Sequence, residues 1–168
     1  MIRRDAHALP GLEDQARLER AIDMTQMSHT SFSGFSHAAQ QAQQWVNELA
    51  RDLCWSEPSA YRLLKSVLHT LRDWLSPAET ADLAAQLPVL VRGIYFEGWQ
   101  PTKAPACKRT KRDFIIDVRS DFGYDDEVDF DTAIGAVFKL LDRHISHGEI
   151  TQVRNSMRKS LHHLWPAD

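Results

Sequence analysis

The chain repeats itself at an interval of 70 residues, and this repeat restricts the folds that it can adopt. A shift of 70 places Ser76 on Ser146 and Glu79 on Glu149, with apolar residues aligned on both sides of them. The preceding segment aligns with a shift of 69, and its paired positions are Trp45 with Phe114, Val46 with Ile115, Leu49 with Val118, Leu53 with Phe122 and Trp55 with Tyr124. One residue is therefore inserted in the acidic loop near 125–129, where loops accept insertions at little cost. An internal sequence duplication of this kind predicts two copies of one small fold.

Both copies carry apolar residues at three- and four-residue steps, which is the spacing of an amphipathic helix. Capping sequences beginning at Ser76 and Ser146 start a further helix in each copy, because a serine N-cap is followed three residues later by glutamate. Pro88 separates the first of these from another short helix. The predicted helices are 58–75, 77–87, 89–96, 130–145 and 147–157. No segment alternates as a strand does, so the sequence predicts an all-α fold with about four helices per copy.

We expect two tandem pseudo-symmetric helical units packed as one helical bundle. The predicted parts are a poorly ordered N-terminal extension at 1–30, a first repeat at 31–98, a linker at 99–111 and a second repeat at 112–168. In each repeat, burial of the apolar side chains nearly balances the entropy cost of ordering the chain. Packing of the two repeats against each other is therefore expected to supply the net stability.

Composition and charge favour a globular protein of ordinary type. The 168 residues are 43% apolar and 26% charged, which is typical of soluble domains. No apolar run is long enough to cross a bilayer or to serve as a secretory signal, so a cytoplasmic location without membrane contact is expected. The net charge of -3 disfavours general nucleic-acid binding. Cys54 and Cys107 lack the C-x-x-C spacing of redox or zinc motifs, which predicts free thiols and no cofactor.

Four stretches together resemble a known family. They are W-V-N-E-L at 45–49, A-A-Q-L-P at 84–88, R-G-I-Y-F-E-G-W-Q-P at 92–101 and L-W-P at 164–166. Over residues 31–166 the chain resembles the bacterial domain-of-unknown-function 2267 family. The resemblance implies an all-helical duplicated fold and implies no activity, cofactor or partner. Proteins of this family usually begin near the position of Met27, so residues 1–26 are expected to be either an extension or the result of a misplaced start.

The chain departs from the family pattern at the end of the first helix. The family usually carries glycine there, as Gly123 does in the second copy, but the first copy has Cys54. A left-handed cap costs a non-glycine residue about 1 kcal/mol. Either the first helix ends differently, or Cys54 adopts a strained conformation.

The aromatic segment 92–101 has two interpretations. In the structural one, Tyr95 and Trp165 close the core at equivalent places in the two repeats, and the following residues turn the chain into the linker. In the functional one, Arg92, Tyr95, Glu97 and Trp99 line a groove between the repeats. The cluster holds more aromatic and charged side chains than a turn requires, which favours binding. We leave both interpretations open here.

The linker 103–112 contains five basic residues and no acidic one. Lys108, Arg109, Lys111 and Arg112 are therefore candidate contacts for an anion such as a nucleic-acid phosphate. The stretch lacks interleaved aromatic residues, and the whole chain is mildly acidic. A solvated linker is the simpler interpretation, and a regulatory protein that contacts nucleic acid is the alternative.

Metal and catalytic motifs are weak. An acidic loop starting at Asp125 lacks the glycine and glutamate of a calcium-binding loop, so its acids are better explained by the dipole of the helix that follows. His144, His147 and Glu149 could ligate zinc but span a helix junction. His69 lies at the edge of an apolar stripe and is interpreted as structural.

No nucleophile elbow, phosphate-binding loop or H-E-x-x-H motif is present in the sequence. The sequence predicts no catalytic residues. The preferred function is a non-enzymatic binding or interaction module whose partner, an unidentified protein or small ligand, docks in the groove between the repeats. A metal-dependent enzyme is the last alternative.

Overall fold

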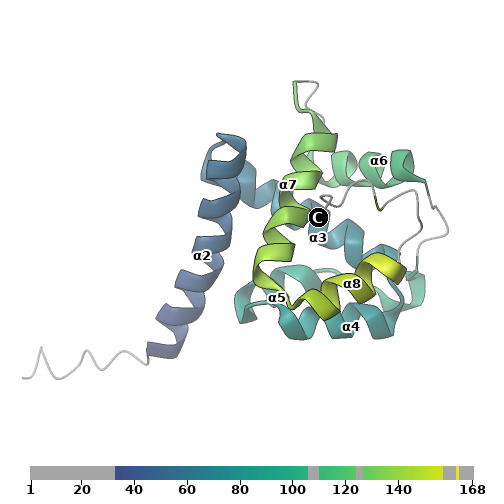
Figure 1. The fold of residues 1–168 in the computed structure, drawn as a ribbon, viewed down its shortest axis with the longest axis horizontal. Coiled ribbons are helices and arrows are strands. Elements are labelled where there is room, and N and C mark those ends of the chain that lie inside the picture. The colour runs from purple at the N-terminus through teal and green to yellow at the C-terminus, as the bar shows by residue number, and fades with distance from the viewer. Residues whose placement is uncertain (1–32, 106–109, 124–126, 157–161, 163–168) are drawn as a thin grey trace, which may run out of the picture. The chain divides into compact units, whose positions relative to one another are not determined.

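The computed structural model describes residues 33–105, 110–123, 127–156 and 162. Two compact units are distinguished, Met1–Ser36 and His37–Asp168, and the second contains the core. The described residues form seven α-helices and one short 3-10 helix, and no strand occurs among them (Figure 1). The elements are α2 (Ser33–Leu53), α3 (Glu57–Trp74), α4 (Pro77–Gln86), α5 (Val89–Phe96), η1 (Pro101–Lys103), α6 (Lys111–Phe122), α7 (Phe130–His144) and α8 (His147–Ser156). The predicted all-α class is confirmed.

The predicted helices form because their local start and stop signals are satisfied. The Ser76 side chain accepts from the Glu79 amide and the Glu79 carboxylate accepts from the Ser76 amide, which completes the capping box of α4. Leu87 is extended before Pro88, and α5 begins directly afterwards. Ser146 accepts from the amide of Glu149 at the start of α8. These contacts confirm the starts that the sequence predicts for α4, α5 and α8.

The number of helices per copy was expected to be about four. The segment expected to be the first repeat contains four helices, α2 to α5. The described part of the segment expected to be the second contains three, α6 to α8. An equivalent of α5 would fall after Ser156, where only residue 162 is described, and the 1–30 extension also lies outside the described residues.

Two helices end at residues with positive φ. Cys54 follows α2 with a φ of 56°, and Gly123 follows α6 with a φ of 101°. A left-handed conformation is tolerated by a non-glycine residue only at a cost of about 1 kcal/mol. Of the two expectations for Cys54, the strained conformation is therefore the correct one. Helix α2 ends at a residue with positive φ although that residue is not glycine.

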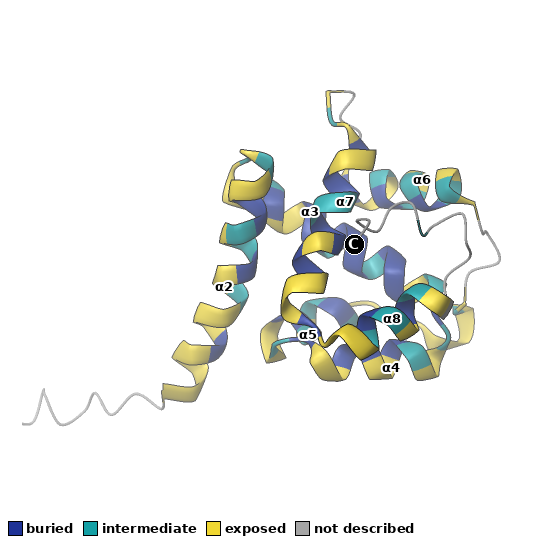
Figure 2. Ribbon diagram, viewed as in Figure 1, coloured by how far each residue is buried: buried dark blue, intermediate teal, exposed yellow. Residues whose placement is uncertain are grey.

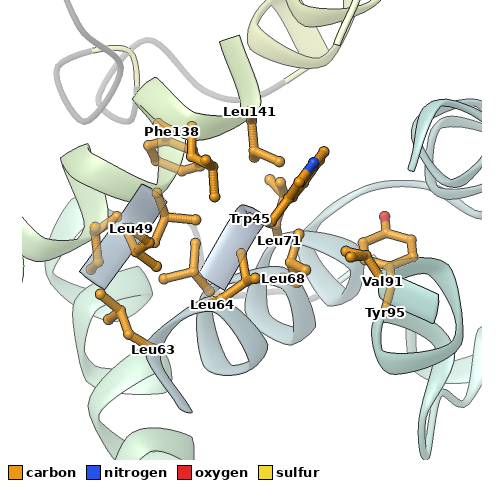
Figure 3. Packing of buried hydrophobic residues seen from close by; sticks show 14 of the residues in the cluster. Trp45, Leu49, Leu63, Leu64, Leu68, Leu71, Val91, Tyr95, Phe138 and Leu141 are labelled. Atoms are coloured by element: carbon orange, nitrogen blue, oxygen red, sulfur yellow. The ribbon is translucent and has the colours of Figure 1, made fainter. Parts of the chain in front are cut away.

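The core is built around α3. Its apolar stripe of Leu63, Leu64, Val67, Leu68 and Leu71 is fully or almost fully buried, and Figure 2 shows that buried residues run along most of this helix. Helices α5, α6 and α7 pack on α3, while α4 packs on α8. Figure 3 shows side chains from several helices meeting in this core, among them Trp45, Leu49, Phe138 and Leu141. Burial of each such large apolar side chain stabilises the fold by about 1.5 to 3 kcal/mol.

Within the described residues, no helix is both long enough and apolar enough to span a membrane.

Candidate functional site

A pocket of about 690 Å³ opens between α3, the connection after α5, and α6. From α3 it is lined by His69, Thr70, Arg72, Asp73 and Trp74. The connection contributes Gly98, Gln100 and Lys103, and α6 contributes Asp117, Ser120 and Asp121. On both helices the lining residues include positions spaced by three and four, so each helix turns one polar face toward the pocket. Most of the lining residues therefore have polar side chains.

Arg72 is buried at the floor of the pocket, with only 6% of its side chain exposed. Its Nη1 donates to the main-chain oxygen of Tyr95 and, at 2.7 Å, to that of Glu97. Its Nε donates to Asp73 Oδ1 at 3.1 Å. Carbonyl groups at the end of a helix lack partners within the helix. Arg72 supplies donors to the carbonyl groups at the end of α5. It thereby holds the segment after α5 that forms one wall of the pocket.

His69 bridges two other walls of the pocket. Its Nε2 lies 2.8 Å from the main-chain oxygen of Ile94 in α5, and its Nδ1 lies 3.5 Å from Asp121 Oδ2 in α6. Burial lowers the pKa of His69 below its ordinary value of 6.5, and this effect outweighs the hydrogen bond to Ile94 and the charge of Asp121, which act in the opposite direction. His69 is therefore mainly neutral at pH 7.

Trp74 and Asp117 join α3 to α6 beside the pocket. The indole Nε1 of Trp74 donates to Asp117 Oδ2 at 3.2 Å. The same indole packs edge-on against Phe114, with ring centroids 5.2 Å apart. The pocket lining thus holds the carboxylates of Asp73, Asp117 and Asp121 against the cations of Arg72 and Lys103.

Arg92, Tyr95, Glu97 and Trp99 were predicted to line a groove, and that groove stays a prediction. None of them is part of the lining of this pocket. Tyr95 is fully buried in the core, which leaves it no surface for a ligand, and burial raises its pKa. Arg92 donates to the main-chain oxygens at the end of α4, where Pro88 interrupts the helix.

Glu97 and Trp99 lie nearer the surface. Glu97 pairs with Lys65 at 2.7 Å, and Trp99 packs on Phe96 with ring centroids 5.2 Å apart. The segment 92–101 contributes to the pocket through Gly98 and Gln100 instead. Gly98 has a φ of 70°, which turns the chain from α5 toward the pocket wall.

The predicted basic contacts are only partly described. Lys108 and Arg109 lie outside the described residues. Lys111 pairs with Asp131, and Arg112 is exposed on α6. The structure thus assigns Lys111 an intramolecular partner, and anion binding by the linker stays a prediction.

The acidic and histidine clusters have structural partners. Asp129 caps α7 by accepting from the amides of Asp131 and Thr132, as the position of the acids before that helix indicated. His144 contacts Glu48 in α2 rather than His147. Among the described residues, no group of three or more His, Cys, Asp or Glu side chains could hold a metal ion.

Sequence reasoning gave the pocket residues no functional role. His69, Arg72 and Asp73 were visible at the edge of the α3 stripe, and Asp117 and Asp121 have the same spacing on α6. The missing information was that α3 packs against α6, which depends on contacts far apart in the chain.

Comparisons with known proteins test the family resemblance. A comparison with curated proteins finds no match. Residues 42–164 match the family described as Uncharacterized conserved protein (DUF2267), which confirms the resemblance drawn from the four sequence stretches. Because the match covers most of its length, the chain belongs to the DUF2267 family of uncharacterized conserved proteins.

Proposed function

We propose that this protein is a non-enzymatic binding module built from a duplicated helical block, and that its ligand occupies the pocket between the two copies. In this proposal the repeats are 31–98 and 112–168, joined by the linker 99–111. The pocket draws α3 from the first repeat and α6 from the second. A ligand bound there would contact both copies at once.

Equivalent contacts support the duplication. The first set joins α3 to α6, where Trp74 donates to Asp117 and packs on the ring of Phe114. The second set joins α7 to α2 at the positions given by the shifts of 70 and 69. There His144 Nε2 lies 2.8 Å from Glu48 Oε2, and its ring stacks on Trp45 with centroids 5.0 Å apart.

These two sets match residue by residue. Trp74 corresponds to His144 with a shift of 70, while Asp117 and Phe114 correspond to Glu48 and Trp45 with a shift of 69. Each copy therefore packs its second helix on the first helix of the other copy. A crossed arrangement of this kind is what a two-fold axis between the copies would produce.

Contacts between α4 and α8 support the same axis. Gln152 Nε2 donates to Asp82 Oδ2 at 3.5 Å, and these residues are 70 positions apart. A residue that contacts its own equivalent lies close to a two-fold axis. The helix bounds also agree, since Pro77–Gln86 and His147–Ser156 differ by 70 at both ends.

The single observation that carries the binding proposal is the composition of the pocket. Ligand sites are concave and use a small number of placed polar groups to orient the ligand. Here a buried arginine and a largely buried histidine sit in the wall of a 690 Å³ pocket, beside carboxylates and an indole. Burial of these ionisable groups costs free energy, which favours a role beyond packing.

The test is an NMR screen on the full chain. We would add small anionic, neutral and cationic compounds separately and follow the amide signals of Gly98, Gln100 and Ser120. Ser120→Trp would fill the pocket from α6, and Lys139→Trp on the exposed face of α7 is the matched control. At least one class of compound should shift the three amides in the native and control proteins but not in Ser120→Trp.

The proposal fails if no class shifts these amides, or if the same shifts occur in Ser120→Trp. It also fails if the compounds shift signals only at surfaces away from α3 and α6.

A further inference from the structure

The hydrogen bonds of His69 fix the position of its proton. A carbonyl oxygen can only accept a hydrogen bond, and Nε2 lies 2.8 Å from the oxygen of Ile94. Nε2 must therefore carry the hydrogen. In the neutral imidazole the other nitrogen, Nδ1, then presents a lone pair and can only accept.

This lone pair faces a second acceptor. Nδ1 lies 3.5 Å from Asp121 Oδ2, and no hydrogen lies between them while His69 is neutral. Only 12% of the His69 side chain is exposed, so water has limited access to Nδ1. Among the described residues, His69 is the one side chain shown within ion-pair distance of the Asp121 carboxylate, and the charge of Lys65 also acts on that carboxylate. The two atoms form a site with two acceptors and no donor.

The equivalent place in the other copy contains a cation. With the shifts of 70 and 69, Asp73 corresponds to Arg143, and Asp117 and Asp121 correspond to Glu48 and Asp52. Arg143 Nη2 lies 2.7 Å from Asp52 Oδ2, and its Nε lies 3.7 Å from Glu48 Oε2. The guanidinium of the chain itself thus occupies the position between the two acids of α2. In the pocket an aspartate stands where that arginine would be.

We propose that the pocket binds a small organic cation carrying N–H groups, a guanidinium or primary ammonium, which donates to His69 Nδ1 and Asp121. This inference rests on the proposed function, because it names the ligand class of the same pocket. The ligand takes the place that Arg143 holds in the other copy. A guanidinium has five N–H donors in a plane and can contact two acceptors together.

The other charges near His69 are compatible with a bound cation. Arg72 pairs with Asp73, and Lys65 pairs with Glu97, so each of these cations already has an acidic neighbour. Trp74 also lines the pocket and offers the face or edge of an indole to the ligand. Cations are attracted to the faces of indole rings.

Binding of the cation and protonation of His69 exclude each other. When His69 is protonated, Nδ1 carries a hydrogen and donates to Asp121, so both acceptors are occupied. Burial keeps the pKa of His69 below 6.5, so the acceptor form is present at neutral pH. Affinity for the ligand should fall on acidification by up to about tenfold per pH unit below the pKa of His69. By reciprocity, bound ligand should lower the pKa of His69 further.

The test compares n-propylguanidinium with n-propyltrimethylammonium in NMR titrations of the full chain. The two probes carry the same charge and the same alkyl chain, but the second has no N–H group. We expect n-propylguanidinium to shift Gly98 and Ser120 and to bind at least about tenfold more tightly. Equal affinity for the two probes would overturn the inference, because charge or contact with the indole would then account for binding.

Variants locate the contact. Asp121→Asn and Asp73→Arg should each reduce the affinity by about tenfold or more, the second because it supplies the missing guanidinium within the chain. Asp142→Asn, an exposed carboxylate on α7, is the matched control and should leave the affinity unchanged. His69→Gln keeps a donor for Ile94 and should remove the pH dependence. An unaltered affinity in Asp121→Asn would refute the assignment.

The NMR pH titration of the His69 ring gives an independent readout. If saturating n-propylguanidinium leaves the pKa of His69 unchanged, the ligand does not use Nδ1 and the inference is wrong. If anionic or neutral compounds shift the pocket amides while n-propylguanidinium does not, the binding module stands and only the ligand class fails. If nothing shifts the pocket amides, both proposals fail.

Discussion

Arg72→Met is expected to destabilise the fold strongly although it removes no apolar packing. The aliphatic part of methionine fills a similar volume to the arginine stem, so the change isolates the guanidinium. Arg72 donates to the main-chain oxygens of Tyr95 and Glu97 and to the carboxylate of Asp73. Tyr95 is fully buried, so water does not readily replace the lost donor at its carbonyl oxygen.

The magnitude follows from these contacts. Each hydrogen bond from the charged guanidinium contributes about 1.5 to 3 kcal/mol, and there are two to main-chain oxygens. The contact with the half-exposed Asp73 adds about 0.5 kcal/mol. Arg72→Met also removes the cost of burying the guanidinium charge, which offsets part of the lost hydrogen-bond free energy. The net loss in the free energy of unfolding should be about 3 kcal/mol.

Urea denaturation followed by tryptophan fluorescence measures this loss. Arg112→Met, on the exposed side of α6, is the control and should change the free energy of unfolding by less than about 0.5 kcal/mol. A loss below about 1 kcal/mol for Arg72→Met would refute the view that this arginine holds the end of α5.

Other predictions concern the links between helices and their ends. Burial tends to raise the pKa of Glu48, but the hydrogen bond and charge of His144, with other contacts, lower it overall. Glu48 therefore stabilises the fold fully above its ordinary pKa of 4.5, and this contribution is lost as the pH falls through its lowered pKa. Glu48→Gln should flatten a plot of unfolding free energy against pH between these two pKa values. Gly123→Ala should cost about 1 to 3 kcal/mol in urea denaturation, because its φ of 101° and ψ of 143° suit glycine alone, while Cys54→Ala should be nearly neutral. Arg92→Met should cost about 1 to 2 kcal/mol in the same assay, since it removes the side-chain donor from the main-chain oxygens of Ala84 and Leu87 at the end of α4.

The helices were predictable because their signals are local. The Ser76 capping box, the break at Pro88 and the spacing of apolar residues are each contained within a few turns of the chain. The end of α2 was narrowed to two possibilities, a different helix end or a strained Cys54, and the structure has the positive φ at Cys54. In all of these cases the residues that determine the conformation are neighbours in sequence.

The roles of the arginines could not be predicted in the same way. Arg92 looked like a groove residue because it stands beside aromatics, but Pro88 leaves carbonyl oxygens open at the end of α4 and Arg92 donates to them. Arg72 contacts main-chain oxygens more than twenty residues away. Such contacts depend on how α3, α4 and α5 pack, and the periodicity of a helix does not specify which helix covers its face.

The repeat itself contains a charge pattern that becomes meaningful only with the packing. Between the copies, the acidic positions of α2 and α6 agree, as with Asp52 and Asp121, whereas Arg143 in α7 aligns with Asp73 in α3. If each copy packed only on itself, this reversal would be an ordinary surface difference. In the packed chain Arg143 pairs with Asp52 between α7 and α2, whereas Asp73 pairs with Arg72 and lines the pocket between α3 and α6. Under the proposed duplication and binding function, this one position would close the contact between α7 and α2 and leave the corresponding position of α3 available to a ligand.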